Sequence, residues 1–165
     1  MPLVVPPNLP GRDSFVHDGN LSLGGTGWEG SGATVEFATS PKKYQFGSLK
    51  VTVDGSNVGA KQKAANGYPV TPGKSYLADI SCIADEANDA LEVHMIVAQY
   101  RANDSYIGNA VDSGQLVLAT DEWKVAPGAF EAHAEAAYVL LFAITWGAQT
   151  GIFYLGGARV RPADK

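Results

Sequence analysis

Apolar and polar residues alternate in two segments of the chain. In Ser48–Val53 (SLKVTV) the leucine and both valines fall on one face, and the lysine and threonine fall on the other. Leu91–Gln99 alternates in the same way. One of its faces is aliphatic, whereas the other is chemically mixed and contains Glu92, His94, Ile96 and Ala98. Because a period of two residues is typical of a strand with one buried face, we predict a strand in each segment.

Three further segments are predicted strands. Tyr138–Trp146 (YVLLFAITW) is apolar on both faces, which is typical of a central strand that is covered on each side. We predict the last strand over Ile152–Val160. Val70–Lys74 (VTPGK) places Pro and Gly where a tight turn needs them, and a strand over Ser75–Ala84 should follow that turn.

The secondary structure of two segments between residues 121 and 137 is harder to predict. Asp121–Val125 (DEWKV) favours another short strand. Ala129–Ala137 (AFEAHAEAA) is rich in helix formers, but the rest of the chain has strand patterning, so we expect a loop or one helical turn there.

The number and spacing of these segments indicate the fold class. About eight to ten short strands at hairpin-like spacing predict an all-β antiparallel β-sandwich, with jelly-roll as the leading topology. The chain has 165 residues, a usual size for one domain, which we place at 11–165. Residues 1–10 (MPLVVPPNLP) are predicted to form an extended N-terminal arm, because proline fixes φ and removes a backbone donor.

Charge and cysteine content exclude several partners. The net charge is −5, and the basic residues do not gather in clusters, so we expect no binding to nucleic acid. The arm has neither a basic n-region nor a sustained apolar stretch, so we expect no secretory signal and no membrane span. Cys82 is the only cysteine and should pack in the core.

No catalytic motif stands out. Gly25–Gly30 (GTGWEG) fits a dinucleotide-binding pattern, but a strand-like run follows it where that site needs a helix. His17, His94 and His133 lack metal-site spacing, and no nucleophile elbow is present. Two carboxylates could still meet across strands as in a glycosidase. We expect no enzyme activity and no cofactor.

The aromatic residues point to carbohydrate binding. A flat exposed ring can stack on the apolar face of a sugar while polar side chains bond the hydroxyls. We expect Trp123 to be structural, and we expect burial for the phenylalanines, which are Phe15, Phe37, Phe46, Phe130, Phe142 and Phe153. Four aromatic residues at strand ends or in loops are the predicted stacking residues: Tyr68, Tyr100, Tyr106 and Trp146.

Six short motifs occur in an order that resembles a known group. They are Asn8-Leu9 with Phe15, Thr26–Trp28 (TGW), Phe46–Val51 (FGSLKV), Val70–Tyr76 (VTPGKSY), Glu122-Trp123 and Phe153–Leu155 (FYL). Together they span nearly the whole chain and resemble the carbohydrate-binding modules of families four, nine and twenty-two. The resemblance implies a jelly roll whose concave sheet holds a glycan chain. It also implies that Glu92, His94 and Tyr100 line the groove.

The resemblance also bears on metal binding. Members of the group often place acidic residues after the first Phe and in the last strand, where they serve a structural calcium. This chain has Val16 and Gly156-Gly157 at those places, which supply no such ligands. We predict no calcium at that site.

Three functional hypotheses remain open. The first is weak, reversible binding to a polysaccharide or cell-surface glycan, strengthened by multivalent display. The second is a component of a phage virion surface, either a capsid decoration or a tail protein, which forms a homo-oligomer and contacts other virion subunits through the arm. The third is an accessory module excised from a secreted, extracellular polysaccharide hydrolase.

Overall fold

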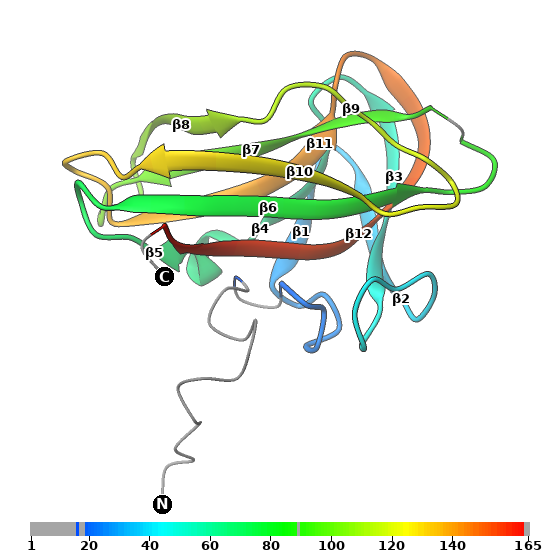
Figure 1. The fold of residues 1–165 in the computed structure, drawn as a ribbon, viewed down its shortest axis with the longest axis horizontal. Coiled ribbons are helices and arrows are strands. Elements are labelled where there is room, and N and C mark those ends of the chain that lie inside the picture. The colour runs from blue at the N-terminus through cyan, green and yellow to red at the C-terminus, as the bar shows by residue number, and fades with distance from the viewer. Residues whose placement is uncertain (1–15, 17–18, 89, 164–165) are drawn as a thin grey trace, which may run out of the picture.

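Two antiparallel sheets pack face to face because nearly every long strand carries one apolar face (Figure 1). The computed structural model describes residues 16, 19–88 and 90–163. The predicted arm at 1–10 and Phe15 lie outside these residues. No helix in this part of the chain is long and apolar enough to cross a membrane.

The first layer is a seven-stranded sheet. Its main path is β1 (Trp28–Ser31), β4 (Gly59–Gln62), β11 (Tyr138–Thr145), β7 (Glu92–Tyr100) and β8 (Tyr106–Asp112). Two short strands extend it, β5 (Tyr68–Pro69) beside β11 and β9 (Leu116–Val117) beside β7. A 3-10 turn, η1 (Ala64–Asn66), lies between β4 and β5.

The second layer is a five-stranded sheet. Its order is β10 (Lys124–Glu131), β6 (Ser75–Ala84), β12 (Gln149–Pro162), β3 (Ser48–Gly55) and β2 (Thr34–Ala38). The pairs in both sheets are antiparallel. The predicted all-β antiparallel sandwich is therefore confirmed.

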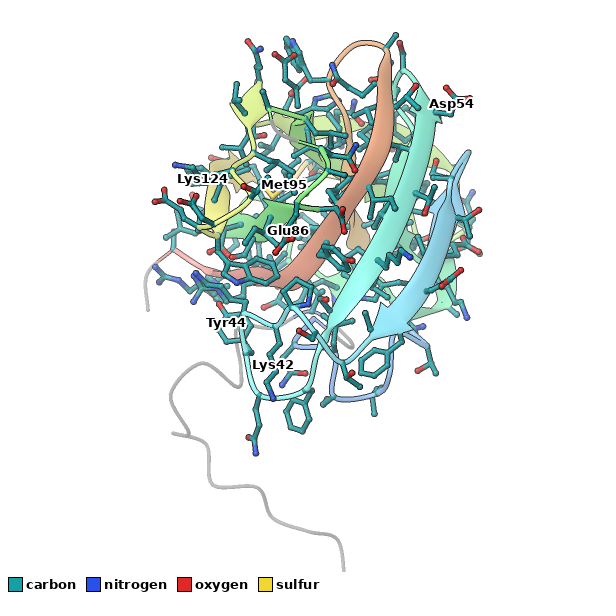
Figure 2. The ribbon with its side chains drawn as sticks, turned by 90° about the vertical axis from the view of Figure 1, so that its right-hand side faces the viewer. Lys42, Tyr44, Asp54, Glu86, Met95 and Lys124 are labelled. Carbon is teal, nitrogen blue, oxygen red and sulfur yellow. The ribbon has the colours of Figure 1, made fainter. Side chains whose placement is uncertain are left out.

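The core lies between the two sheets. The aliphatic face of β7 is buried there, and Met95 of that face is completely covered (Figure 2). In β3 the three predicted inward residues are buried, whereas Thr52 is exposed. Cys82 is also fully buried, and this burial raises the pKa of its thiol. The predicted alternation in β3 and β7 is confirmed.

The predicted Asp121–Val125 strand is wrong at its start and too short. β10 begins at Lys124 and runs to Glu131, because it pairs with β6 from Cys82 back to Ser75. Pairing with β6 thus overrides the helix propensity of the first residues of Ala129–Ala137. The remainder of that segment, 132–137, is a loop with a turn, as predicted.

Three phenylalanines of the described residues are not in the core between the sheets. Phe37 is 40% exposed and Phe46 is 45% exposed, so their predicted burial is wrong. Phe142 is half-buried and packs against a second apolar cluster outside that core. Phe37 lies on the edge strand β2, and its ring packs over the backbone of Gly47. Phe130 and Phe153 are buried as expected.

Candidate functional site

A second apolar cluster lies on the outer face of the seven-stranded sheet. It consists of Ile96, Ala98 and Ile144, with Tyr100 and Phe142 packed against it. The cluster forms because β7 and β11 are neighbouring central strands and both carry apolar residues on their outer faces. We call this cluster the apolar floor.

A cavity of about 370 Å³ opens over the apolar floor. Its lining residues come from β7, β8, β11 and the loop before β4, and they are Asn57, His94, Ile96, Ala98, Tyr100, Tyr106, Asn109, Asp112, Phe142 and Ile144. The cavity thus combines aliphatic, aromatic and hydrogen-bonding side chains on one face of the sheet.

Three tyrosines form a row at one end of the cavity, and two of them, Tyr100 and Tyr106, line it. Tyr100 of β7 pairs with Tyr106 of β8 on one side and with Tyr138 of β11 on the other. The Tyr100 and Tyr138 rings stack with centroids 5.3 Å apart, and the Tyr100 and Tyr106 rings meet at 60° with centroids 5.7 Å apart. We call these residues the tyrosine row.

Hydrogen bonds fix the outer rings of the tyrosine row. The Tyr106 hydroxyl donates to Asn109 Oδ1 at 2.8 Å, and the Tyr138 hydroxyl donates to Asp104 Oδ1 at 2.9 Å. Desolvation and the bond to Asp104 together raise the pKa of Tyr138 to about 12. Desolvation, with a smaller contribution from Tyr106, raises the pKa of Tyr100. The phenols of Tyr100 and Tyr138 therefore stay protonated near neutral pH.

The opposite end of the cavity is polar. His94 is only 5% exposed, and its Nδ1 lies 2.8 Å from Asp112 Oδ1 while its Nε2 lies 3.3 Å from Asn57 Oδ1. Partial desolvation would raise the pKa of Asp112, but the hydrogen bonds from His94 and from the Gly114 N–H outweigh it and lower that pKa. A carboxylate, an imidazole and an amide therefore meet at this end.

Trp146 and Glu92 lie beside the polar end. The Trp146 ring meets the His94 ring edge-on, with centroids 5.1 Å apart and planes at 88°, and Trp146 is 37% exposed. Glu92 begins β7 two residues before His94, so its side chain is on the same face of the strand. Neither residue lines the cavity itself.

Five of the six predicted binding residues thus share one face. His94, Tyr100 and Tyr106 line the cavity, and Trp146 and Glu92 lie next to His94. Tyr68 is the one that the structure does not bring to this face. It pairs with Val139, whose side chain is in the core, and its ring packs edge-on against Tyr76. Tyr68 therefore faces the interior of the sandwich.

Sequence reasoning missed six residues at this site. They are Asn57, Asn109, Asp112, Phe142 and Ile144, which line the cavity, and Tyr138, which stacks on Tyr100. The three on β11 lie in the run that is apolar on both faces, and this pattern could have shown that alternate members face outward. The three polar ones reach the site through loop position and strand register, for which the sequence carries no clear signal.

Aromatic and aliphatic side chains surround Gly156 and Gly157, which stand where the resembling group often has its calcium ligands. Trp123 and Lys43 cover Gly156, and the Tyr44 ring covers Gly157, at a register shift in β12. Tyr44 and Lys42 lie on the loop between β2 and β3 (Figure 2). Trp123 is half-buried, in keeping with the structural role predicted for it. In the part of the chain that the structure describes, no group of three or more His, Cys, Asp or Glu could hold a metal ion.

Comparison with known proteins places this arrangement in a fold group. No family model matches the chain, and no curated protein does. Among solved structures, the C-terminal family 22 carbohydrate-binding module of Clostridium thermocellum Xyn10B aligns with a TM-score of 0.69 at 14% identity, and the match covers 94% of this chain and 97% of that one. The chain has the fold of a family 22 carbohydrate-binding module. The predicted resemblance and the jelly-roll topology are thereby confirmed.

Two other solved structures share the module fold. The CBM22-1 xylan-binding domain of Paenibacillus barcinonensis Xyn10C has a TM-score of 0.68 and 14% identity, with 90% of this chain and 92% of that chain covered. The enzymatically active domain of tailspike protein 4 of bacteriophage CBA120 has a TM-score of 0.67 and 11% identity. That match covers 91% of this chain but 21% of the tailspike chain.

Proposed function

We propose that the outer face of the seven-stranded sheet binds a glycan without catalysing a reaction. The observation that carries this proposal is the tyrosine row at one end of the cavity, with His94, Asp112 and Asn57 at the other end. Rings of this kind stack on the apolar face of a sugar, and the polar groups can bond its hydroxyls. The shared fold with two xylan-binding or family 22 modules supports the same role.

The cavity has room for more than one sugar ring. Tyr100 and His94 are six residues apart on β7, which corresponds to about 20 Å along an extended strand. A glycan chain that lies along β7 can therefore contact the tyrosine row and the polar end together. A shallow site of this kind typically gives about micromolar to millimolar affinity, because each contact is small and ordering the chain opposes binding.

The test of this proposal is direct binding. A glycan array identifies the ligand, and affinity electrophoresis or calorimetry then measures it with the wild type and with Tyr100→Ala. The matched control is Phe46→Ala, an exposed aromatic that precedes β3 of the other sheet. We expect Tyr100→Ala to weaken binding about tenfold and Phe46→Ala to leave it unchanged. Equal binding by all three proteins would refute the assigned site, and no binding to any glycan would refute the function.

We further propose that multivalent display on a virion surface compensates for the weak affinity of one site. The tailspike structure supports this setting, and the xylanase modules equally support the alternative of an accessory domain in a secreted hydrolase. Measuring the mass of the native protein separates the two. A symmetric homo-oligomer supports the virion component, whereas a monomer supports the accessory module.

A further inference from the structure

We propose that the sugar bound in this cavity carries a methyl group, which contacts the apolar floor. The methyl group can belong to an acetyl substituent or to the terminal carbon of a 6-deoxy sugar. This inference rests on the proposed glycan binding and narrows its substrate class. It follows from the distribution of polar and apolar side chains along β7, β8 and β11.

The middle of the cavity lacks polar side chains on its two central strands. Between the tyrosine row and His94, the outward residues of β7 are Ile96 and Ala98, and their partners on β11 are Phe142 and Leu140. Ile144, opposite His94, extends the apolar surface toward the polar end. The backbone groups between β7 and β11 are paired with each other in the antiparallel ladder. The floor of the cavity is therefore a continuous aliphatic and aromatic surface.

The polar side chains of the cavity stand at its ends and along the β8 side, and several are already engaged. Asp112 accepts from the Gly114 N–H and bonds His94, which also contacts Asn57. The Asn109 side chain accepts from the Tyr106 hydroxyl. The hydrogen-bonding capacity that remains lies at these edges, where Asn109 and Asp112 of β8 flank the apolar floor at Ala98 and Ile96.

A hydroxyl and a methyl group differ sharply in how they fit this floor. A sugar hydroxyl pressed against the side chain of Ile96 or Ile144 loses its water and gains no hydrogen bond from that side chain, which opposes binding. A methyl group in the same position leaves water and contacts carbon atoms, which favours binding. Ile96, Ala98 and Ile144 are each at most 7% exposed. The apolar area that they leave open to solvent is therefore small, and one methyl group covers much of it.

The first experiment compares ligands with and without the group that bears the methyl carbon. Acetylated xylan is compared with the same xylan after mild alkaline deacetylation, and methyl α-L-fucoside is compared with methyl α-L-galactoside. Affinity electrophoresis measures the polymers and calorimetry measures the monosaccharides. We expect the methylated member of at least one pair to bind about fourfold tighter or more, which is the value of burying one such group. The two pairs also distinguish an acetyl source from a 6-deoxy source.

The second experiment changes the floor. Ile144→Thr and Ile144→Val give side chains of nearly equal size, one with a hydroxyl in place of a methyl group. Ile144→Val should keep the preference for the methylated ligand, and Ile144→Thr should reduce the affinity ratio of that pair to about one. If thermal melts show that Ile144→Thr does not fold, Ala98→Ser replaces it, with the wild type as its reference.

Distinct outcomes bear on the two proposals. Equal affinity within both ligand pairs, or tighter binding of an array glycan that has no methyl group, overturns the inference and leaves glycan binding intact. The inference is also overturned if Ile144→Thr, or Ala98→Ser in its place, folds and keeps the affinity ratio of the ligand pair unchanged. Absence of binding to every array glycan overturns the proposed function and this inference together.

Discussion

Tyr100 and Tyr138 stack face to face on neighbouring strands, with ring centroids 5.3 Å apart and planes 7° from parallel. The two residues are direct partners in the register of β7 and β11. Each ring therefore holds the other in place before any ligand arrives. Rings that are ordered in advance lose little conformational entropy on binding, which suits a site whose individual contacts are weak.

The stack predicts a difference between two substitutions of Tyr138. Tyr138→Phe keeps the ring but loses the hydrogen bond to Asp104, so glycan affinity should change by less than about threefold. Tyr138→Ala removes the support of Tyr100 and should weaken binding about tenfold. Calorimetry with the glycan found on the array measures both. If the phenylalanine variant loses as much affinity as the alanine variant, the hydroxyl and not the stacked ring is the important group.

Substitution of Gln62 should lower the free energy of unfolding, although this residue does not line the cavity. β11 pairs with β5 at Val139 and with β4 from Phe142 onward, and the fully buried Gln62 side chain fills the gap by accepting from the Leu141 N–H. Its amide group also donates to the Asn66 carbonyl at 3.3 Å. Gln62→Met keeps the volume but leaves both backbone groups without this partner, so the free energy of unfolding should fall by about 1–3 kcal/mol.

Urea unfolding measures the effect of this substitution. The matched control is Gln149→Met, because that amide bonds the Trp146 carbonyl at an exposed position and its loss should cost less than about 0.5 kcal/mol. Equal free energies for the two variants would contradict the bridging role of Gln62.

Asp112 predicts a pH dependence of stability. Its folded-state pKa lies below its ordinary value of about 3.9, so its interactions stabilise the folded protein above that pH and are lost as pH falls through the folded-state pKa. The wild type should therefore exceed Asp112→Asn in free energy of unfolding at neutral pH. This difference should shrink below pH about 4. Urea unfolding at several pH values tests it, and a difference that stays constant or widens in acid would contradict the assignment.

Gly156 predicts a steric effect at the register shift of β12. A Cβ at this position would lie 2.6 Å from Trp123 Cη2 and 2.8 Å from Lys43 Cβ, so Gly156→Ala should destabilise the fold by about 1–3 kcal/mol. Gly108→Ala is the control, because nothing lies within 4 Å of its Cβ position. Thermal melts compare the two. Trp123→Leu in the Gly156→Ala background should restore part of the loss, and failure to do so would show that Trp123 is not the obstacle.

The sequence carried most of the strand pattern but only part of the site. Period-two alternation located β3 and β7, and the doubly apolar run located β11, because these patterns depend on burial by the sheets themselves. The end of β10 could not be found in this way, because pairing with β6 decides it. The site residues on β7 could be predicted because they lie on the chemically mixed face of that strand.

Register explains why other site residues were missed or misplaced. Tyr68 and Tyr138 both lie at ends of strands, yet pairing turns Tyr68 toward the core and Tyr138 toward the outer face, where it stacks on Tyr100. A shift of one residue would reverse either orientation. Asp112 similarly meets His94 only because β8 pairs with β7 at Ile96.

The measurement that tests the central claim most directly is a backbone-amide NMR titration of the isotope-labelled protein with the glycan found on the array. If the outer face of the seven-stranded sheet is the binding site, the chemical shift changes should cluster at Ile96, Tyr100 and Tyr106, with the indole N–H of Trp146 moving less, because Trp146 lies beside the cavity. Changes that cluster on β2, β3 or β12 of the other sheet, with the cavity residues unmoved, would contradict the account.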